Sequence, residues 1–172
     1  MFPLGIIDYF ARVHKNYTQL ENMAPLLERK QPNNRFYLVF VSSLASFYPM
    51  PLKATYAASK RFLLDIACAL REELKDSNTR VLTLCPGGLT TTEEAMDKIR
   101  AQGFWGDLTT NRLEVVARET VDRALAGKAL YVPGFTNRVL LYIGKCVPRT
   151  LVAHLIYRRW RKALQFELNP HP

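Results

Sequence analysis

The sequence predicts an α/β fold in which a partial, doubly wound parallel sheet of about three strands is flanked by helices and followed by a helical C-terminal tail. Short β-rich apolar runs alternate with segments of helical periodicity, as in sheets joined by helical crossovers. The 172 residues are 48% hydrophobic and 23% charged, which is ordinary for a globular protein with a sizeable core. We expect a single domain over residues 1–172, with an α/β core at 1–135 and a basic amphipathic tail at 136–172.

The first half of the chain contains two predicted helices and two predicted strands. Apolar residues recur at helical spacing over 4–30, and after a turn the run at 36–41 is rich in aromatic and β-branched residues. A segment rich in alanine and leucine predicts the next helix at about 55–75, and a strand follows at 80–85. The apolar face of this second helix consists of Leu63, Leu64, Ala67, Leu70 and Leu74.

The second half begins with an irregular pattern at 88–112, before a predicted helix at about 113–126 and a short strand at 129–132. Three strands are only part of a doubly wound sheet. We therefore expect the first strand to have an open edge, at which the chain can associate with another segment or with a second copy.

Three polar side chains are spaced so that they can meet at one edge of this sheet. Tyr56 and Lys60 are four residues apart on a predicted helix and therefore share a face. Ser43 follows the first strand, at the carboxyl end where open α/β sheets bind ligands. A phenol with an ordinary pKa of about 10 exchanges protons poorly at neutral pH, and a nearby cation favours its phenolate form. This pattern indicates chemistry at a carbonyl or alcohol oxygen.

Ser43, the Tyr56-x-x-x-Lys60 stretch and the Pro86-Gly87 pair together resemble the Ser, Tyr-x-x-x-Lys and Pro-Gly elements of the short-chain dehydrogenase/reductase family. The resemblance implies a Rossmann-like fold and reversible hydride transfer between NAD or NADP and a small carbonyl or alcohol substrate. It implies that Ser43 bonds the carbonyl oxygen and Tyr56 exchanges the proton. Lys60 would favour the phenolate and, with Tyr56, hold the cofactor ribose.

The resemblance extends to two further site residues. Asn16 matches the catalytic asparagine of the family, which implies a water-linked proton path to the lysine, although a polar residue on an ordinary helix is the alternative. Thr91, with Pro86 and Gly87, matches a Pro-Gly-x-apolar-x-Thr loop that contacts the nicotinamide end. The segments 132–138 and 147–149 resemble the tail of a bacterial-type branch with poorly defined carbonyl substrates. Phe104 and Trp105 are candidates for substrate contact or for core packing.

The glycine-rich turn that opens the family fold is missing from this sequence. The eight glycines stand at positions 5, 87, 88, 103, 106, 127, 134 and 144, and no three of them fit Gly-x-x-x-Gly-x-Gly. Such a turn holds a pyrophosphate at a helix N-terminus. The chain therefore looks like the catalytic half of such an enzyme, a truncated form. It is either an oxidoreductase whose nucleotide-binding half comes from elsewhere, or an inactive remnant that serves as an interaction or membrane-surface module.

The formal net charge of +9 arises from 24 basic and 15 acidic residues, and the excess is concentrated in the tail. Basic residues there alternate with apolar ones, as in amphipathic helices that lie on anionic membranes. The interpretations are, in order of preference, a solvated tail that closes over the substrate cleft, contact with a membrane surface or a lipid-like substrate and, least favoured, binding to nucleic acid. No apolar run reaches the roughly 20 residues that a spanning helix needs.

The cysteines and histidines indicate in which cellular compartment the protein lies and whether it binds a metal ion. Cys68, Cys85 and Cys146 are an odd number without metal-ligand spacing, and the three histidines are scattered, so no metal site is predicted. Two of the cysteines lie in apolar runs, which predicts reduced, buried thiols and a cytoplasmic protein. The N-terminus has no basic leader or long apolar core of a signal peptide. Membrane association and homo-oligomerisation stay open.

Overall fold

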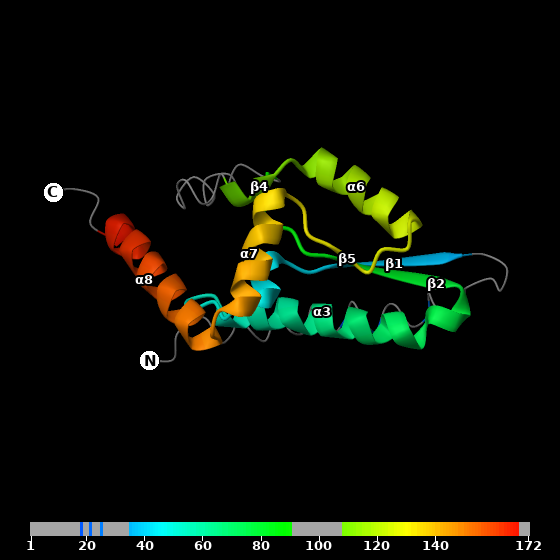
Figure 1. Cartoon of the computed structure of the whole chain (residues 1–172), viewed down its shortest axis with the longest axis horizontal. Coiled ribbons are helices and arrows are strands. Elements are labelled where there is room, and N and C mark those ends of the chain that lie inside the picture. The colour runs from blue at the N-terminus through cyan, green and yellow to red at the C-terminus, as the bar shows by residue number, and fades with distance from the viewer. Residues whose placement is uncertain (1–17, 19–20, 22–24, 26–34, 91–107, 169–172) are drawn as a thin grey trace.

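The computed structural model describes residues 18, 21, 25, 35–90 and 108–168. A parallel sheet in the order β1-β2-β5 forms its centre, with β1 at Phe36–Val41, β2 at Thr79–Leu84 and β5 at Leu130–Tyr131. Helix α3 (Ala54–Glu73) covers one face of this sheet, and α6 (Leu113–Leu125) covers the other (Figure 1). The predicted α/β fold is confirmed, whereas the helix expected at 4–30 falls almost wholly outside the described residues.

The burial of each strand follows its place in the sheet. In the central strand β2 every side chain except that of Arg80 is buried, because helices cover both faces. The edge strand β1 alternates between buried and more exposed positions, and Val39 and Val41 are 42% and 52% exposed. As predicted, β1 lies at an edge of the described sheet.

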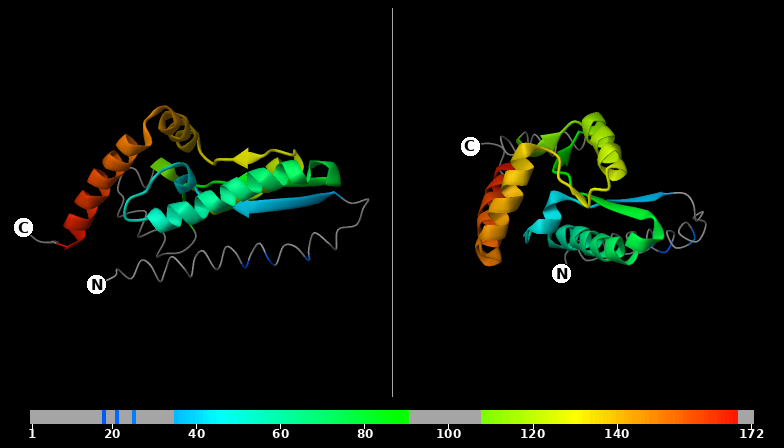
Figure 2. Two further views of the ribbon diagram at one scale, coloured as in Figure 1. Left: turned by 90° about the horizontal axis from the view of Figure 1, so that it is seen from below. Right: turned by 45° about the vertical axis from the view of Figure 1, so that its right-hand side comes forward.

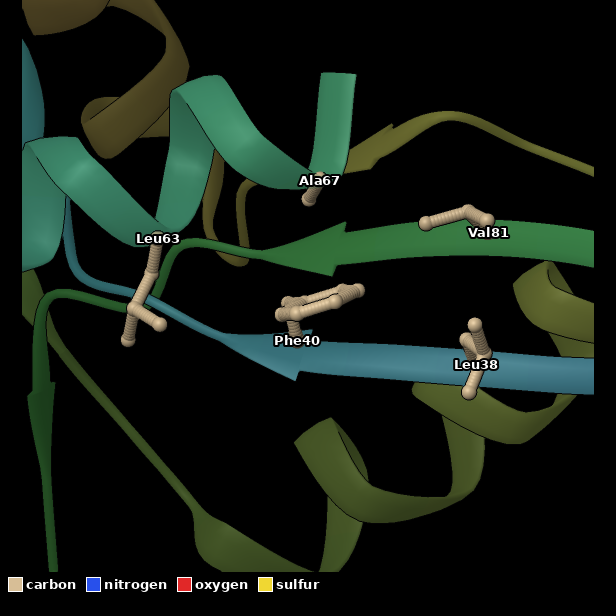
Figure 3. Packing of buried hydrophobic residues seen from close by; sticks show 5 residues of the cluster. All are labelled: Leu38, Phe40, Leu63, Ala67 and Val81. Atoms are coloured by element: carbon tan, nitrogen blue, oxygen red, sulfur yellow. The ribbon is translucent and has the colours of Figure 1, made fainter. Parts of the chain in front are cut away.

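A buried cluster on the α3 side of the sheet joins three elements (Figure 3). It contains Leu38 and Phe40 of β1, Leu63 and Ala67 of α3, and Val81 of β2. Leu70 and Leu74 pack at its margin. Leu64 is buried in a second cluster with Cys85, Val132 and Leu141, so the apolar face predicted for this helix is confirmed.

The direction of α3 is fixed by its connection to the sheet. A 3-10 turn, η2 (Lys75–Ser77), joins the end of α3 to the beginning of β2, where Thr79 pairs with Phe36 at the start of β1. The last turn of α3 therefore lies near the amino ends of the strands, and its first turns lie near their carboxyl ends. This arrangement positions the helix residues discussed below.

The remaining described elements are short strands and the C-terminal helices. A two-residue strand β3 (Gly88–Leu89) pairs with β4 (Thr110–Asn111), and a 3-10 turn η1 (Leu44–Phe47) follows β1. The tail consists of α7 (Phe135–Cys146) and α8 (Arg149–Leu168), and α8 extends away from the sheet (Figures 1 and 2). Within the described ranges, none of the helices combines the length and apolarity needed to cross a membrane.

Only one of the three cysteines is buried, so the prediction of buried thiols is wrong for the other two. Cys85 is fully buried after β2, whereas Cys68 and Cys146 are exposed. Cys68 lies one residue past the packing face of α3, and Cys146 lies opposite the buried face of α7. An apolar run does not determine which of its residues face the core.

Candidate active site

The carboxyl ends of β1 and β2 are held together beyond the last residues of the strands. The Ser42 N–H donates to the Leu84 carbonyl at 2.8 Å, and the Leu44 N–H donates to the Pro86 carbonyl at 2.7 Å. These bonds continue the β1–β2 ladder and fix Ser43, which is 8% exposed, beside Pro86. Two of the predicted site elements therefore meet at one edge of the sheet.

The Ser43 side chain caps the turn that follows β1. Its hydroxyl oxygen accepts a hydrogen bond from the Ala45 N–H at 3.2 Å, and the hydroxyl donates to the Pro86 carbonyl at 3.5 Å. The Ser46 hydroxyl donates to the Ser43 carbonyl at 2.7 Å. A cap of this kind satisfies a donor at the start of the turn, so the Ser43 hydroxyl is fixed by local backbone geometry.

Lys60 joins the second turn of α3 to the end of β1 through two hydrogen bonds. Its ammonium donates to the Val41 carbonyl at 3.1 Å, and its own carbonyl accepts from the Ser42 hydroxyl at 2.7 Å. The positive charge of Lys60 therefore lies at the carboxyl end of β1, beside Val41, which is two residues before Ser43.

Tyr56 lies one helical turn before Lys60 on the same face of α3. Tyr56 is half-buried, and its backbone carbonyl accepts a hydrogen bond from the Ser59 hydroxyl at 2.9 Å. At a rise of about 1.5 Å per residue, Tyr56 is roughly 10 Å further along the helix axis than Leu63, which packs against β1. The tyrosine is therefore beyond the carboxyl ends of the strands, on the side of Ser43 and Lys60.

The loop after β2 approaches neighbouring backbone so closely that Gly87 leaves no room for a side chain. A Cβ built on Gly87 would overlap the Thr109 carbonyl oxygen and lie 2.9 Å from the Asn137 amide nitrogen. Pro86 is buried, whereas Gly87 and Gly88 are half-buried. Glycine is required here by this contact, and the loop backbone stays accessible at the carboxyl edge.

Asn137 of α7 packs against this loop, and only 1% of the Asn137 surface is exposed. Its amide nitrogen donates to the carbonyls of Thr109 and Pro133 at 3.1 and 2.8 Å. Because both neighbours are acceptors, the amide orientation is determined. The Asn137 carbonyl oxygen has no hydrogen-bond partner in the described part of the chain. Sequence reasoning did not single out this residue, although a polar side chain on the packing face of a predicted apolar helix was the available signal.

Burial keeps two acidic groups near this edge in their neutral forms. Burial raises the pKa of the Cys85 thiol, immediately before Pro86, to about 11. It also raises the pKa of Tyr48, which follows η1, to about 12. A neutral, fully buried thiol is a poor nucleophile, so Cys85 acts here as a core residue.

The structure does not describe all of the predicted site. Ser43, Tyr56, Lys60, Pro86 and Gly87 are placed at or beyond the carboxyl ends of the strands. Asn16 and Thr91 lie outside the described residues, as do Phe104 and Trp105. Hydroxyl, phenol and ammonium groups at one edge suit the binding and protonation of a substrate oxygen.

Comparison with known families gives a match over about half of the chain. The family described as short chain dehydrogenase matches residues 16–102, a range that contains the predicted catalytic and cofactor-binding residues but not Phe104 and Trp105. The match therefore covers β1, α3 and β2 and stops before α6.

Curated relatives match over different parts of the chain. The hydroxysteroid 11-beta-dehydrogenase 1-like protein of Xenopus tropicalis is 42% identical over 64 residues, covering 37% of this chain and 22% of that protein. Dehydrogenase/reductase SDR family member 7B of Rattus norvegicus is 29% identical over 159 residues, covering 88% and 45%. Human 17-beta-hydroxysteroid dehydrogenase type 3 is 30% identical over 114 residues, covering 66% and 33%. The chain thus spans less than half the length of each.

Among solved structures, 4-hydroxyisoleucine dehydrogenase complexed with NADH aligns with a TM-score of 0.42 and 23% identity. The alignment covers 58% of this chain and 46% of that chain.

Proposed function

Because this chain belongs to the short-chain dehydrogenase family, we propose that it supplies the catalytic side of an NAD- or NADP-dependent oxidoreductase acting on a carbonyl or alcohol group. The observation that carries this proposal is the hydrogen bond from the Lys60 ammonium to the Val41 carbonyl. It brings the cation to the edge where Ser43 and Pro86 meet, one helical turn from Tyr56.

Each polar group at this edge has a distinct role in the proposed reaction. The Ser43 hydroxyl exchanges its 3.5 Å hydrogen bond to the Pro86 carbonyl for one to the substrate oxygen and orients that oxygen. The Tyr56 hydroxyl gives a proton to that oxygen during reduction and removes it during oxidation. The Lys60 ammonium stabilises the phenolate that remains on Tyr56. By family resemblance, Asn16 holds a water-linked proton path to Lys60.

The residues at the carboxyl edge fit the nicotinamide and ribose end of the cofactor. Tyr56 and Lys60 would hold the ribose hydroxyls, while Pro86, Gly87 and Thr91 would contact the nicotinamide. When bound, this group supplies or accepts the hydride. Gly87 supports the fit, since the loop there exposes backbone without a side chain. The sequence contains no Gly-x-x-x-Gly-x-Gly turn for the pyrophosphate.

A second candidate function is that of an inactive remnant that serves as an interaction or membrane-surface module, and the exposed apolar residues of α7 favour it. The two functions differ in whether the carboxyl edge binds a nicotinamide. Reduced nicotinamide mononucleotide is a suitable probe, because it lacks the adenosine half for which the sequence has no recognisable turn.

Binding of this mononucleotide to the purified chain can be measured by saturation-transfer NMR. We expect transfer to the nicotinamide protons, and we expect Lys60→Ala to abolish it. Lys75→Ala, which alters an exposed lysine in the η2 turn after α3, should leave it unchanged. NADH should bind within about tenfold of the mononucleotide, a difference of less than about 1.4 kcal/mol. Absence of transfer in the unaltered chain would favour the remnant.

Catalysis by Tyr56 can be tested in any form of the protein that reduces a carbonyl compound. Tyr56→Phe deletes one hydroxyl and keeps the ring, so kcat should fall at least about a hundredfold while the fold is retained. Tyr157→Phe, on the exposed surface of α8, is the matched control. Near-normal turnover by the Tyr56→Phe protein would remove the tyrosine from the mechanism.

A further inference from the structure

We propose that the outer face of α7, extended by α8, is a docking surface for a membrane rich in anionic phospholipids. The proposal depends on the surface of these two helices and not on catalysis. Three observations support it: a stripe of exposed apolar side chains, the cations that border this stripe, and the distribution of charge along the whole chain.

The first observation is the apolar stripe on α7, which consists of Phe135, Val139, Tyr142 and Ile143. These four side chains are 74%, 38%, 66% and 55% exposed. Their spacing places them on one side of the helix, opposite the buried residue Asn137. Single exposed apolar residues are common, but a contiguous row along one helix is typical of a binding surface. Phenylalanine and tyrosine also suit the boundary between lipid and water.

The second observation is that cations border the stripe. Arg138 and Lys145 of α7 are exposed, and their positions in the helix place both on the same flank of the stripe. On α8, Leu151 and Leu155 are 48% and 55% exposed, and Arg158 is exposed nearby. An apolar face with basic residues along its margin is the pattern of helices that lie in the membrane interface.

The third observation is that the charge excess of the whole chain lies in this part of the sequence. Residues 123–166 contain no aspartate or glutamate. The basic residues of this run are Arg123, Lys128, Arg138, Lys145, Arg149, Arg158, Arg159, Arg161 and Lys162. These nine account for the formal net charge of +9, because the rest of the chain has 15 basic and 15 acidic residues. Each cation near an anionic leaflet strengthens binding to that leaflet.

Other occupants fit this surface less well. In a symmetric dimer that pairs antiparallel α7 helices through the stripe, the flank that carries Arg138 and Lys145 would meet the same flank of the other copy, and like charges repel. Nucleic acid would satisfy the cations but would leave aliphatic side chains such as Val139 and Ile143 without an apolar partner. An anionic bilayer satisfies both the charge and the apolar area.

The stripe lies close to the candidate active site. Asn137 faces the opposite side of α7 and bonds to Thr109 next to Gly87. The stripe and this loop are thus separated by about one helix diameter, roughly 10 Å. One consequence rests on the proposed function: docking would bring the candidate active site to the membrane surface. Apolar carbonyl compounds partition into that surface.

Co-sedimentation with lipid vesicles tests the proposal. The purified chain should bind vesicles of phosphatidylcholine with phosphatidylserine, bind pure phosphatidylcholine at least about tenfold more weakly, and dissociate as salt is raised. Arg138→Gln with Lys145→Gln should weaken binding about tenfold, and so should Phe135→Ser with Tyr142→Ser. The control on α6, Arg118→Gln with Val121→Ser, changes an exposed cation and a 58% exposed apolar residue and should bind normally.

Two native cysteines allow the bound face to be identified directly. Cys146 lies at the end of α7 and Cys68 lies on α3, and both are exposed. A polarity-sensitive fluorophore on Cys146, in a Cys68→Ser background, should shift to the blue on anionic vesicles. The same dye on Cys68, in a Cys146→Ser background, should not shift.

Several outcomes would overturn the proposal. Equal binding to neutral and anionic vesicles, or equal dye shifts at Cys146 and Cys68, would show that lipid binding is not specific to this surface. Absence of vesicle binding together with dimerisation that Phe135→Ser abolishes would assign the stripe to a second copy of the chain. Salt-sensitive binding to an RNA oligonucleotide without vesicle binding would assign it to nucleic acid.

Discussion

Gly87 is the position in the candidate site where one added methyl group should have the largest effect. In Gly87→Ala the new Cβ would meet the Thr109 backbone carbonyl and the Asn137 amide, neither of which can move without disturbing the hydrogen bonds that join Asn137 to Thr109 and Pro133. We expect a loss of about 1–3 kcal/mol in the free energy of unfolding, seen as a lower urea midpoint at an unchanged m-value.

Gly144→Ala in α7 is the comparison for this variant. Its Cβ would meet the Tyr48 ring, a side chain. Alanine also favours the helix by about 1 kcal/mol over glycine. The net loss should be smaller than for Gly87→Ala, and an equal or larger loss would show that the backbone around Gly87 adapts easily.

At the same scale, sequence spacing predicted some site residues and missed another for a physical reason. Tyr56 and Lys60 are related by local helix geometry, and Ser43 is placed by the end of a strand, so short-range patterns were sufficient. The role of Asn137 depends on the carbonyls of Thr109 and Pro133, the first of which is 28 residues away. Such a contact exists only once the fold has formed.

At the scale of elements, Arg71 joins three parts of the molecule. One of its guanidinium nitrogens donates to the Val81 carbonyl of β2 at 2.8 Å, and the other donates to the Gly127 carbonyl after α6 at 2.9 Å. Hydrogen bonds from charged donors contribute about 1.5–3 kcal/mol each. Since Arg71 is only half-buried, we expect Arg71→Met to lower the free energy of unfolding by about 2–4 kcal/mol in urea titrations.

Arg61→Met on the same helix is the matched control. Arg61 pairs with Asp65 at 2.8 Å, but the two side chains are 46% and 57% exposed. Exposed ion pairs of this kind contribute about 0–1 kcal/mol. Arg71→Lys should not restore the stability, because one ammonium lacks the planar fork that reaches both carbonyls. Equal losses at the two arginines would refute the bridging role of Arg71.

The helices and strands that were predicted accurately are those whose sequence pattern lies within one continuous segment. The run at 36–41 gave the bounds of β1, and the patterns at 55–75 and 113–126 gave α3 and α6 to within two residues. The short pair β3 and β4 was not predicted, because two-residue strands have no periodicity and their pairing joins segments about 20 residues apart in sequence. The shortest of the predicted strands, β5, is two residues shorter than expected.

At the scale of the whole molecule, the sequence predicted a parallel sheet with an edge at its first strand. Helical segments between β-rich runs allow parallel crossovers, and the order β1-β2-β5 agrees with this expectation. The exposure of individual tail residues could not be predicted in the same way. Periodicity shows that α7 has two faces, but which of them faces the body depends on packing against η1 and the loop after β2.

Three buried acidic groups make the stability of the whole molecule depend on alkaline pH. Burial raises the pKa of Cys85 from 9.0 to about 11 and the pKa values of Tyr48 and Tyr131 from 10.0 to about 12. For Tyr131, the hydrogen bond to Glu119 contributes as well. Below pH 9 these groups are protonated in both the folded and the unfolded chain. As pH rises, the unfolded chain loses its protons first, so the free energy of unfolding falls between about pH 9 and pH 12.

Tyr48→Phe tests this dependence, because the Tyr48 hydroxyl is buried and has no hydrogen-bond partner among the residues that the structure describes. Removing an unsatisfied hydroxyl should not destabilise the protein at pH 7 and should stabilise it slightly. At alkaline pH the variant should lose stability less steeply with pH, by at most about 1.4 kcal/mol per pH unit. Urea midpoints measured at intervals between pH 7 and pH 11 give both slopes. If the two proteins lose stability at the same rate above pH 10, then the buried phenol of Tyr48 does not contribute to alkaline unfolding.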